Sequence, residues 1–257
     1  MADLGAELYA ALRGRSTVPP LVARYPHLTL DDAYAISLDL LRRREADGER
    51  VIGKKIGVTS KPVQDMLGVH QPDFGFLTDA MRVDDGTTIG IEAHRLIQPR
   101  AEAEIAFLLR DDLVGPGVNG AAVLAATEFI APCFEIVDSR IQEWKIGIID
   151  TVADNASCGV FVLGRARVSP AGLDLAGLHV RVIKNGAFLS EGLGESVQGS
   201  PLNAVAWLAN TLGRYGVSLK AGEVILSGSL VPLEPAASGD WFEMKIEGVG
   251  GASVRFA

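Results

Sequence analysis

Two carboxylates, Glu102 and Glu104, open an otherwise apolar run in residues 98–110, QPRAEAEIAFLLR. Side chains alternate between the two faces of a β-strand, so a strand here would direct both glutamates to one face and Ala103 and Ile105 to the other. On a helix the two glutamates would lie about 200° apart. Like charges held together beside a core repel each other and lose hydration. Exposure of this strand end would relieve that cost, and so would a bound cation.

A third carboxylate favours the cation. Glu135 lies in residues 131–140, APCFEIVDSR, and a lone charge among such apolar neighbours would be costly. Three converging glutamates can hold a divalent ion, and an all-oxygen ligand set indicates Mg²⁺ or Mn²⁺ and not zinc. An octahedral ion with three protein ligands keeps three open positions, enough for a chelating substrate and one water.

Three glutamates and a divalent ion leave one net negative charge, so an acidic substrate would need a positive side chain nearby. Lys55 is the candidate, because it stands in the apolar run VIGKKIGV at residues 51–58. The alternative is a surface lysine that lays its aliphatic stem on the protein and keeps its ammonium group in water.

The elements that must position these residues follow from the hydrophobic pattern. Residues 2–48 predict helices, with Thr29 and Asp32 as a T-x-x-D start signal. From residue 51 onward, short apolar runs broken by glycine, proline and Asp-Gly pairs predict strands, and Asn185-Gly186 predicts a hairpin turn. Further helices are expected at residues 119–130 and 200–216, the second with Ser200 as N-cap and Gly216 as C-cap. The predicted strands lie at residues 51–58, 87–93, 103–110, 133–140, 158–164, 178–192, 223–230, 241–248 and 252–257.

This order of elements predicts an α+β fold with a mixed β-sandwich or β-roll core. We expect an N-terminal helical segment at residues 1–50 and a metal-binding β-roll catalytic domain at residues 51–257. A length of 257 residues with 48% hydrophobic residues is sufficient for a substantial core.

Charge and composition exclude several classes of protein. A net charge of -8 argues against binding to nucleic acid or to an anionic membrane surface. The longest apolar runs are too short for a membrane span, and charged residues interrupt the first 20 positions, so we expect neither a span nor a signal peptide. Cys133 and Cys158 lie in apolar runs and are expected to pack as small hydrophobes in a reducing, cytoplasmic protein. A nucleophilic Cys158 is the less favoured alternative.

Five ordered segments resemble one enzyme family: GKKIGVTSKPVQDMLGVHQPDFGFLTDAM, QPRAEAEIAF, PCFEIVDSRIQEWK, DTVADNASCGVFVLG and LKAGEVILSGSLVPLEP. They are similar to the 2-hydroxypenta-2,4-dienoate hydratases, also called 2-oxopent-4-enoate or vinylpyruvate hydratases. These enzymes form part of the hydratase/decarboxylase branch of the fumarylacetoacetate hydrolase superfamily. The likeness extends from about residue 28 to the C-terminus.

The resemblance implies a Mg²⁺ or Mn²⁺ site at Glu102, Glu104 and Glu135. It also implies catalytic and substrate-binding roles for Lys55 and Asp73 and a place near the substrate for Ser157. Without it, Asp73 in HQPDFG would be interpreted as a turn residue. The implied reaction adds water to 2-hydroxypenta-2,4-dienoate and gives 4-hydroxy-2-oxopentanoate, in the meta-cleavage breakdown of aromatic compounds.

Several alternatives remain open on the sequence. The nearest is the 4-oxalocrotonate decarboxylase of the same family, and another is a hydratase for a longer alkyl-substituted dienoate. An acylpyruvate hydrolase would share the metal site. The resemblance also implies a homo-oligomer and a complex with 4-oxalocrotonate decarboxylase, in which this chain would act mainly as a stabilising partner on one interpretation.

Overall fold

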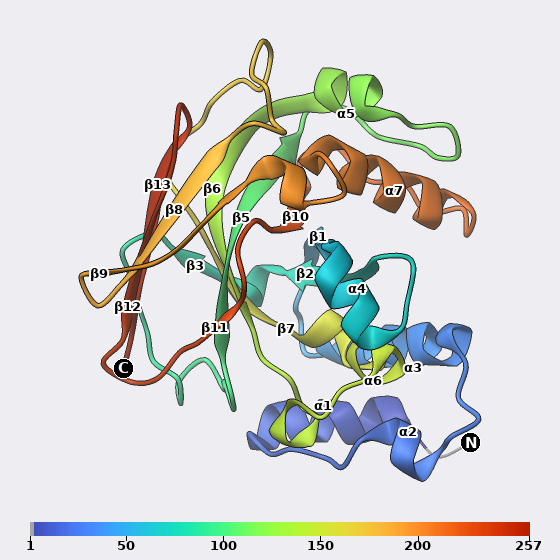
Figure 1. Ribbon diagram of the computed structural model, residues 1–257. Coiled ribbons are helices and arrows are strands. Elements are labelled where there is room, and N and C mark those ends of the chain that lie inside the picture. The colour runs from blue at the N-terminus through green and yellow to red at the C-terminus, as the bar shows by residue number, and fades with distance from the viewer. Residues whose placement is uncertain (1–2) are drawn as a thin grey trace.

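The computed structural model describes residues 3–257 and shows two β-sheets packed together, with helices gathered on one side (Figure 1). The N-terminal helices lie at one end of this helical side, and the C-terminus lies where the last strand of the smaller sheet ends. The helices are α1 (Leu4–Gly14), α2 (Leu21–Arg24), α3 (Leu30–Ala46), α4 (Lys61–Leu67), α5 (Gly120–Ala126), α6 (Ile148–Ala153) and α7 (Pro201–Gly213), with a helical turn η3 (Asn155–Ser157).

The larger sheet has eight strands and is mixed. Its order is β2-β1-β10-β5-β6-β7-β3, and β11 also pairs with β5. The β1–β10 and β3–β7 pairs are parallel and the other pairs are antiparallel. Its strands are β1 (Val51–Gly57), β2 (Asp73–Thr78), β3 (Arg82–Asp84), β5 (Arg100–Leu109), β6 (Thr127–Val137), β7 (Cys158–Leu163), β10 (Val224–Ser229) and β11 (Glu234–Pro235).

The smaller sheet has five strands in the order β4-β13-β12-β8-β9. The β8–β9 turn contains Asn185 and Gly186 with φ of 53° and 81°. A two-residue turn with both φ values positive matches the twist of the adjoining strands, so the predicted hairpin is confirmed. Its strands are β4 (Thr88–Ile89), β8 (His179–Lys184), β9 (Ala187–Leu193), β12 (Trp241–Ile246) and β13 (Gly250–Phe256).

The main core fills the space between the two sheets. Phe134 of β6 meets Phe242 of β12 edge to face, with ring centroids 6.3 Å apart. Ala103 and Ile105 of β5 are buried in this same core. The predicted α+β fold with a β-sandwich core is therefore confirmed. Cys133 and Cys158 are buried free thiols on the other face of the sheet, as expected for small hydrophobes.

The N-terminal helices share an apolar cluster with α6, in which Leu8, Leu40 and Val152 are buried. The predicted start of α3 is confirmed, because Thr29 and Asp32 form a reciprocal capping box. None of the helices in residues 3–257 is both long enough and apolar enough to cross a membrane.

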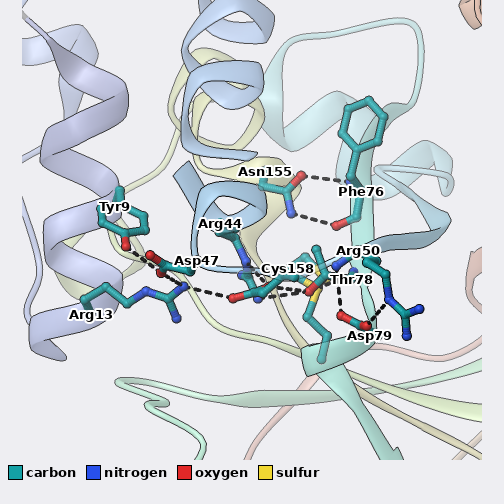
Figure 2. Close-up of polar contacts among 12 residues, drawn as sticks. Tyr9, Arg13, Arg44, Asp47, Arg50, Phe76, Thr78, Asp79, Asn155 and Cys158 are labelled. Atoms are coloured by element: carbon teal, nitrogen blue, oxygen red, sulfur yellow. Dashed lines mark hydrogen bonds and ion pairs between the residues drawn. The ribbon is translucent and has the colours of Figure 1, made fainter. Parts of the chain in front are cut away.

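A partly buried carboxylate, Glu49, connects these helices to the large sheet. It accepts hydrogen bonds from Arg13 of α1 (2.9 Å), Arg44 of α3 (2.7 Å) and the Thr78 hydroxyl of β2 (2.6 Å). Figure 2 shows the three donor side chains converging from these elements. Burial alone would raise the pKa of Glu49, but the charge of Arg44 and the bond from Thr78 lower it overall.

Several predicted boundaries were wrong. The helix expected at residues 119–130 ends at Ala126, because Thr127 already pairs with β5 and begins β6. In the strand expected at residues 87–93, only Thr88–Ile89 pairs. Helix α7 has Ser200 at its N-cap, but the side chain makes no capping hydrogen bond.

The C-terminal end of α7 also differs from the prediction. The C-cap is Arg214 and not Gly216. Gly216 adopts a φ of 73° in the following turn, where the Val217 N–H donates to the Leu212 carbonyl (3.1 Å). The glycine therefore supplies the left-handed residue that ends the helical path, two positions beyond the cap.

Candidate active site

The three predicted glutamates converge on one face of the large sheet. Glu102 lies directly opposite Glu135 in the β5–β6 pair, and Glu104 follows two residues along the same face. One carboxylate oxygen of each residue lies within 4.8 Å of the other two. The apolar side chains between them face the core, so the strand alternation predicted for this segment is confirmed.

Two of these carboxylates are fully buried and accept few hydrogen bonds. Glu104 and Glu135 have no exposed surface. One oxygen of Glu104 accepts from the Gly228 N–H (2.8 Å), but its Oε1 and both Glu135 oxygens accept no hydrogen bond from any described residue. Burial, together with the charge of Glu135, raises the pKa of Glu104 well above its ordinary value and that of Glu102 to about 7. Unpaired buried oxygens that converge in this way fit a divalent cation.

Lys55 of β1 is the positive charge beside this cluster. Its Nζ lies 3.3 Å from Glu135 Oε1, and its side chain is 3% exposed, which excludes the surface-lysine alternative. Burial alone would lower the pKa of Lys55, but the carboxylates of Glu135 and Asp73 raise it overall, so the ammonium form is favoured. Lys55 is thus surrounded by four carboxylates, those of the three glutamates and that of Asp73.

Asp73 begins strand β2 and does not form the turn that its local sequence indicates. Its side chain is buried, and neither oxygen accepts a side-chain or backbone bond of normal geometry from residues 3–257. Burial raises the pKa of Asp73 to about 6, although Lys55 opposes the shift. Gly57 makes room for this carboxylate, because a Cβ there would stand 2.3 Å from Asp73 Oδ1.

A cavity of about 360 Å³ opens over these groups. Lys55, Asp73, Glu102 and Ser157 all line it, while Glu104 and Glu135 are buried next to Glu102 and outside the lining. The site residues predicted from the sequence are therefore brought together around one space. An apolar wall completes the cavity, made of Val63, Met66, Leu67, Val137, Ile146 and Leu233.

Ser157 reaches the cavity from an unusual backbone turn. Asn155, Ala156 and Ser157 have φ of 54°, 51° and 53°, three consecutive left-handed residues without a glycine. Each such residue costs roughly 1–2 kcal/mol, and strain of this kind gathers at functional sites. The Ser157 hydroxyl lies 3.1 Å from the Thr151 hydroxyl, so the two form one polar patch.

Sequence reasoning missed further cavity residues, among them Arg100, Thr151 and Trp144. The guanidinium of Arg100 lies 4.6 Å from the centre of the Trp144 ring. Strand alternation could have found Arg100, since it precedes Glu102 by two residues on the same face. Trp144 and Thr151 follow β6 in irregular or short helical segments, where periodicity carries no comparable signal.

Comparisons with known proteins agree with this geometry. The sequence profile of the fumarylacetoacetate hydrolase C-terminal family matches residues 50–257. A 2-hydroxyhexa-2,4-dienoate hydratase of Comamonas testosteroni is 65% identical over 98% of this chain and 96% of its own length. A 2-hydroxypent-2,4-dienoate hydratase of Pseudomonas putida is 62% identical over 84% of this chain and 97% of its own length.

Among solved structures, a 4-oxalocrotonate decarboxylase of Pseudomonas putida G7, complexed with magnesium and adipate, superimposes with a TM-score of 0.95. It is 35% identical, and the match covers 99% of this chain and 96% of the decarboxylase. The chain therefore belongs to the fumarylacetoacetate hydrolase family and, within it, to the group of 2-hydroxydienoate hydratases.

Proposed function

We propose that this protein is a divalent-metal-dependent hydratase that converts 2-hydroxypenta-2,4-dienoate and water into 4-hydroxy-2-oxopentanoate. The observation that carries the proposal is the convergence of Glu102, Glu104 and Glu135 beside the buried Lys55, at the base of a cavity. The hydratase names of relatives at 62% and 65% identity support the reaction class.

The three glutamates would hold Mg²⁺ or Mn²⁺. When bound, such an ion supplies a Lewis acid that stabilises negative charge on the 2-oxygen of the substrate. The magnesium of the structurally similar decarboxylase supports the choice of a hard divalent ion. A divalent ion would also offset two of the four negative charges of the carboxylates that surround Lys55.

Lys55 and Asp73 are the groups that can hold and move protons. The substrate must first gain a proton at C5 and lose one from its 2-hydroxyl, which gives a 2-oxo-3-enoate; water then adds its hydroxyl at C4 and a proton at C3. We assign to Lys55 the stabilisation of the 2-oxygen, because its charge is buried and directed into the cluster. We assign proton transfer to Asp73, whose pKa of about 6 suits exchange near neutral pH. Ser157 would bind substrate from the turn at residues 155–157.

Dienoates of this class differ in the substituent at C5, the end of the substrate away from the carboxylate. The apolar wall, to which α4 and Leu233 contribute, supports a dienoate with an alkyl group as the alternative substrate. A relative named for a six-carbon dienoate points in the same direction. The decarboxylase reaction is the competing outcome, because the similar decarboxylase has the same fold.

Turnover of purified protein tests the proposal. We expect Mg²⁺-dependent consumption of 2-hydroxypenta-2,4-dienoate, with 4-hydroxy-2-oxopentanoate as product, and loss of turnover when a chelator is added. Dienoates with C5 substituents of increasing length should define the preferred substrate. Release of CO₂ from 2-oxo-3-hexenedioate without dienoate turnover would identify a decarboxylase instead, and cleavage of an acylpyruvate would identify a hydrolase.

We further propose that residues 51–257 form the metal-binding catalytic domain and that residues 1–50 are its helical N-terminal segment. The start of the family match at residue 50 supports this division. We also propose a cytoplasmic homo-oligomer that associates with a 4-oxalocrotonate decarboxylase. Sedimentation of the protein alone and of its mixture with such a decarboxylase tests the last two points.

A further inference from the structure

Strand β2, which carries Asp73, lies at the edge of the large sheet. At Phe76, the backbone N–H and carbonyl that point away from β1 form hydrogen bonds with a side chain. The Phe76 N–H donates to Asn155 Oδ1 (2.8 Å), and the Phe76 carbonyl accepts from Asn155 Nδ2 (3.0 Å). Figure 2 shows this pair of bonds, in which the amide of Asn155 takes the place of a neighbouring strand.

Asn155 is also the first residue of the left-handed turn that carries Ser157. The contact with β2 is very close, because a Cβ at Gly75 would stand 2.5 Å from the Asn155 carbonyl oxygen. On its other side the turn is held by the Asp138 N–H, which donates to the Ser157 carbonyl (2.7 Å). The strained turn is thus held in place from both sides.

From these contacts we infer that Asn155 is a positioning residue for the hydratase reaction, an inference that rests on the proposed function. The Asn155 side chain does not line the cavity. Its two bonds join two segments that each contribute a lining residue, Asp73 from β2 and Ser157 from the turn. The amide therefore fixes the distance between two walls of the active site. Misplacement of a reacting group by about 1 Å can lower a rate by about 10²-fold.

Asn155→Gly is the informative substitution. Glycine adopts a positive φ without a steric cost, so this change removes the two amide bonds and leaves the turn accessible. Asn185→Gly is a matched control. Asn185 also has a positive φ, and its amide also makes two bonds, to Asp240 (2.8 Å) and from the Trp241 N–H (2.9 Å), but it lies in the other sheet.

The first readout is independent of activity. The Phe76 N–H donates to the Asn155 side chain, so amide hydrogen exchange at Phe76 should become faster in Asn155→Gly and remain unchanged in Asn185→Gly. The second readout is turnover of 2-hydroxypenta-2,4-dienoate with Mg²⁺. We expect kcat to fall at least about tenfold in Asn155→Gly and to stay near the wild-type value in the control.

A double-substitution cycle with Ser157→Ala separates positioning from a general loss of stability. If Asn155 acts through the turn, Asn155→Gly should lower kcat much less in the Ser157→Ala protein than in the wild type. Equal effects in both proteins would overturn the inference. Gly75→Ala tests the same contact from the β2 side and should also lower kcat, since the added Cβ would displace the turn.

The outcomes distinguish this inference from the proposed function. A wild-type protein that leaves the dienoate unchanged would overturn the proposed function. An active wild type whose kcat is unaffected by both Asn155→Gly and Gly75→Ala would overturn the positioning role alone. Unchanged exchange at Phe76 in Asn155→Gly would show that the two bonds do not hold β2.

Discussion

Replacement of Glu104 by glutamine should have opposite effects on the metal-free and the metal-loaded protein. In the metal-free protein at pH 8, Glu104 Oε1 is buried with no hydrogen-bond donor from residues 3–257 and lies near two further carboxylates. An unpaired buried polar atom costs about 1–3 kcal/mol, and a charged one costs more. In Glu104→Gln, the amide oxygen can keep the bond from the Gly228 N–H, and the NH₂ group can donate toward Glu102 or Glu135.

We therefore expect Glu104→Gln to increase the free energy of unfolding of the metal-free protein by about 1–3 kcal/mol. Mg²⁺, in contrast, should stabilise the wild type more than the variant. At 100 times the dissociation constant, a ligand that binds only the folded state adds about 2.7 kcal/mol of stability, and this gain should largely disappear in the variant, because a neutral amide is a weaker ligand than a carboxylate.

Chemical denaturation measures both effects, first with a chelator and then over a series of Mg²⁺ concentrations. Glu128→Gln is the matched control, since Glu128 is an exposed glutamate on the same strand as Glu135. It should change neither the metal-free stability nor the gain with Mg²⁺. A Glu104→Gln protein that is less stable without metal, or that keeps the full Mg²⁺ gain, would refute the account of the site.

Three further substitutions test other parts of the structure. Lys55→Met removes the buried ammonium 3.3 Å from Glu135 that we assign to stabilisation of the 2-oxygen, so kcat should fall by about 10²–10³-fold. An unchanged kcat would remove Lys55 from the mechanism. Arg140→Ala leaves Asp154 buried and unpaired, so urea unfolding should show a loss of about 3–5 kcal/mol, whereas Arg165→Ala at the surface should cost under about 1 kcal/mol. Glu49 has a lowered pKa when folded, so its stabilisation is present above its unfolded pKa of 4.5 and is lost as the pH falls through the lower folded value. Glu49→Gln should therefore lose less stability than the wild type in denaturation at pH 3 relative to pH 7.

The metal cluster could be predicted from the sequence because strand alternation fixes its geometry. A period of two residues places Glu102 and Glu104 on one face whatever the rest of the chain does, and an apolar setting makes the burial of Glu135 evident. The pairing of Glu102 with Glu135 is a matter of register between two strands, which local patterns do not encode. The family resemblance implied that the three glutamates share one ion, but the register itself is visible only in the structure.

Other features depend on contacts that no local pattern reports. Asp73 follows a proline in a segment typical of a turn, and it becomes the first residue of β2 because Gly57 on β1 leaves space for its side chain. The left-handed turn at residues 155–157 contains no glycine to indicate it. Its conformation is imposed by the amide bonds to Phe76 and by the close approach of Gly75, which are both tertiary contacts.

The two sides of the cavity differ in a way that predicts how substrate length is controlled. Glu102 and Glu104 stand on β5 and Glu135 on β6, two strands that are paired on both sides and cannot shift to separate these charges. The apolar wall, in contrast, includes three residues of the short helix α4 and the loop residue Leu233. Leu233 also lines a neighbouring cavity of about 570 Å³, which shares Gly57, Val63 and Glu102 with the first. Leu233→Ala should join the two spaces.

Each additional methylene of the substrate that enters the joined space should gain up to about 0.8 kcal/mol, or about fourfold in kcat/KM. We therefore expect Leu233→Ala to raise kcat/KM for long-chain dienoates relative to 2-hydroxypenta-2,4-dienoate, in steps that follow chain length. Leu38→Ala, at an exposed position on α3 that lines neither cavity, removes the same atoms and should leave that ratio unchanged. If both variants show the wild-type ratio at every length, the distal end of the substrate does not face Leu233, and the orientation proposed for it in the cavity is wrong.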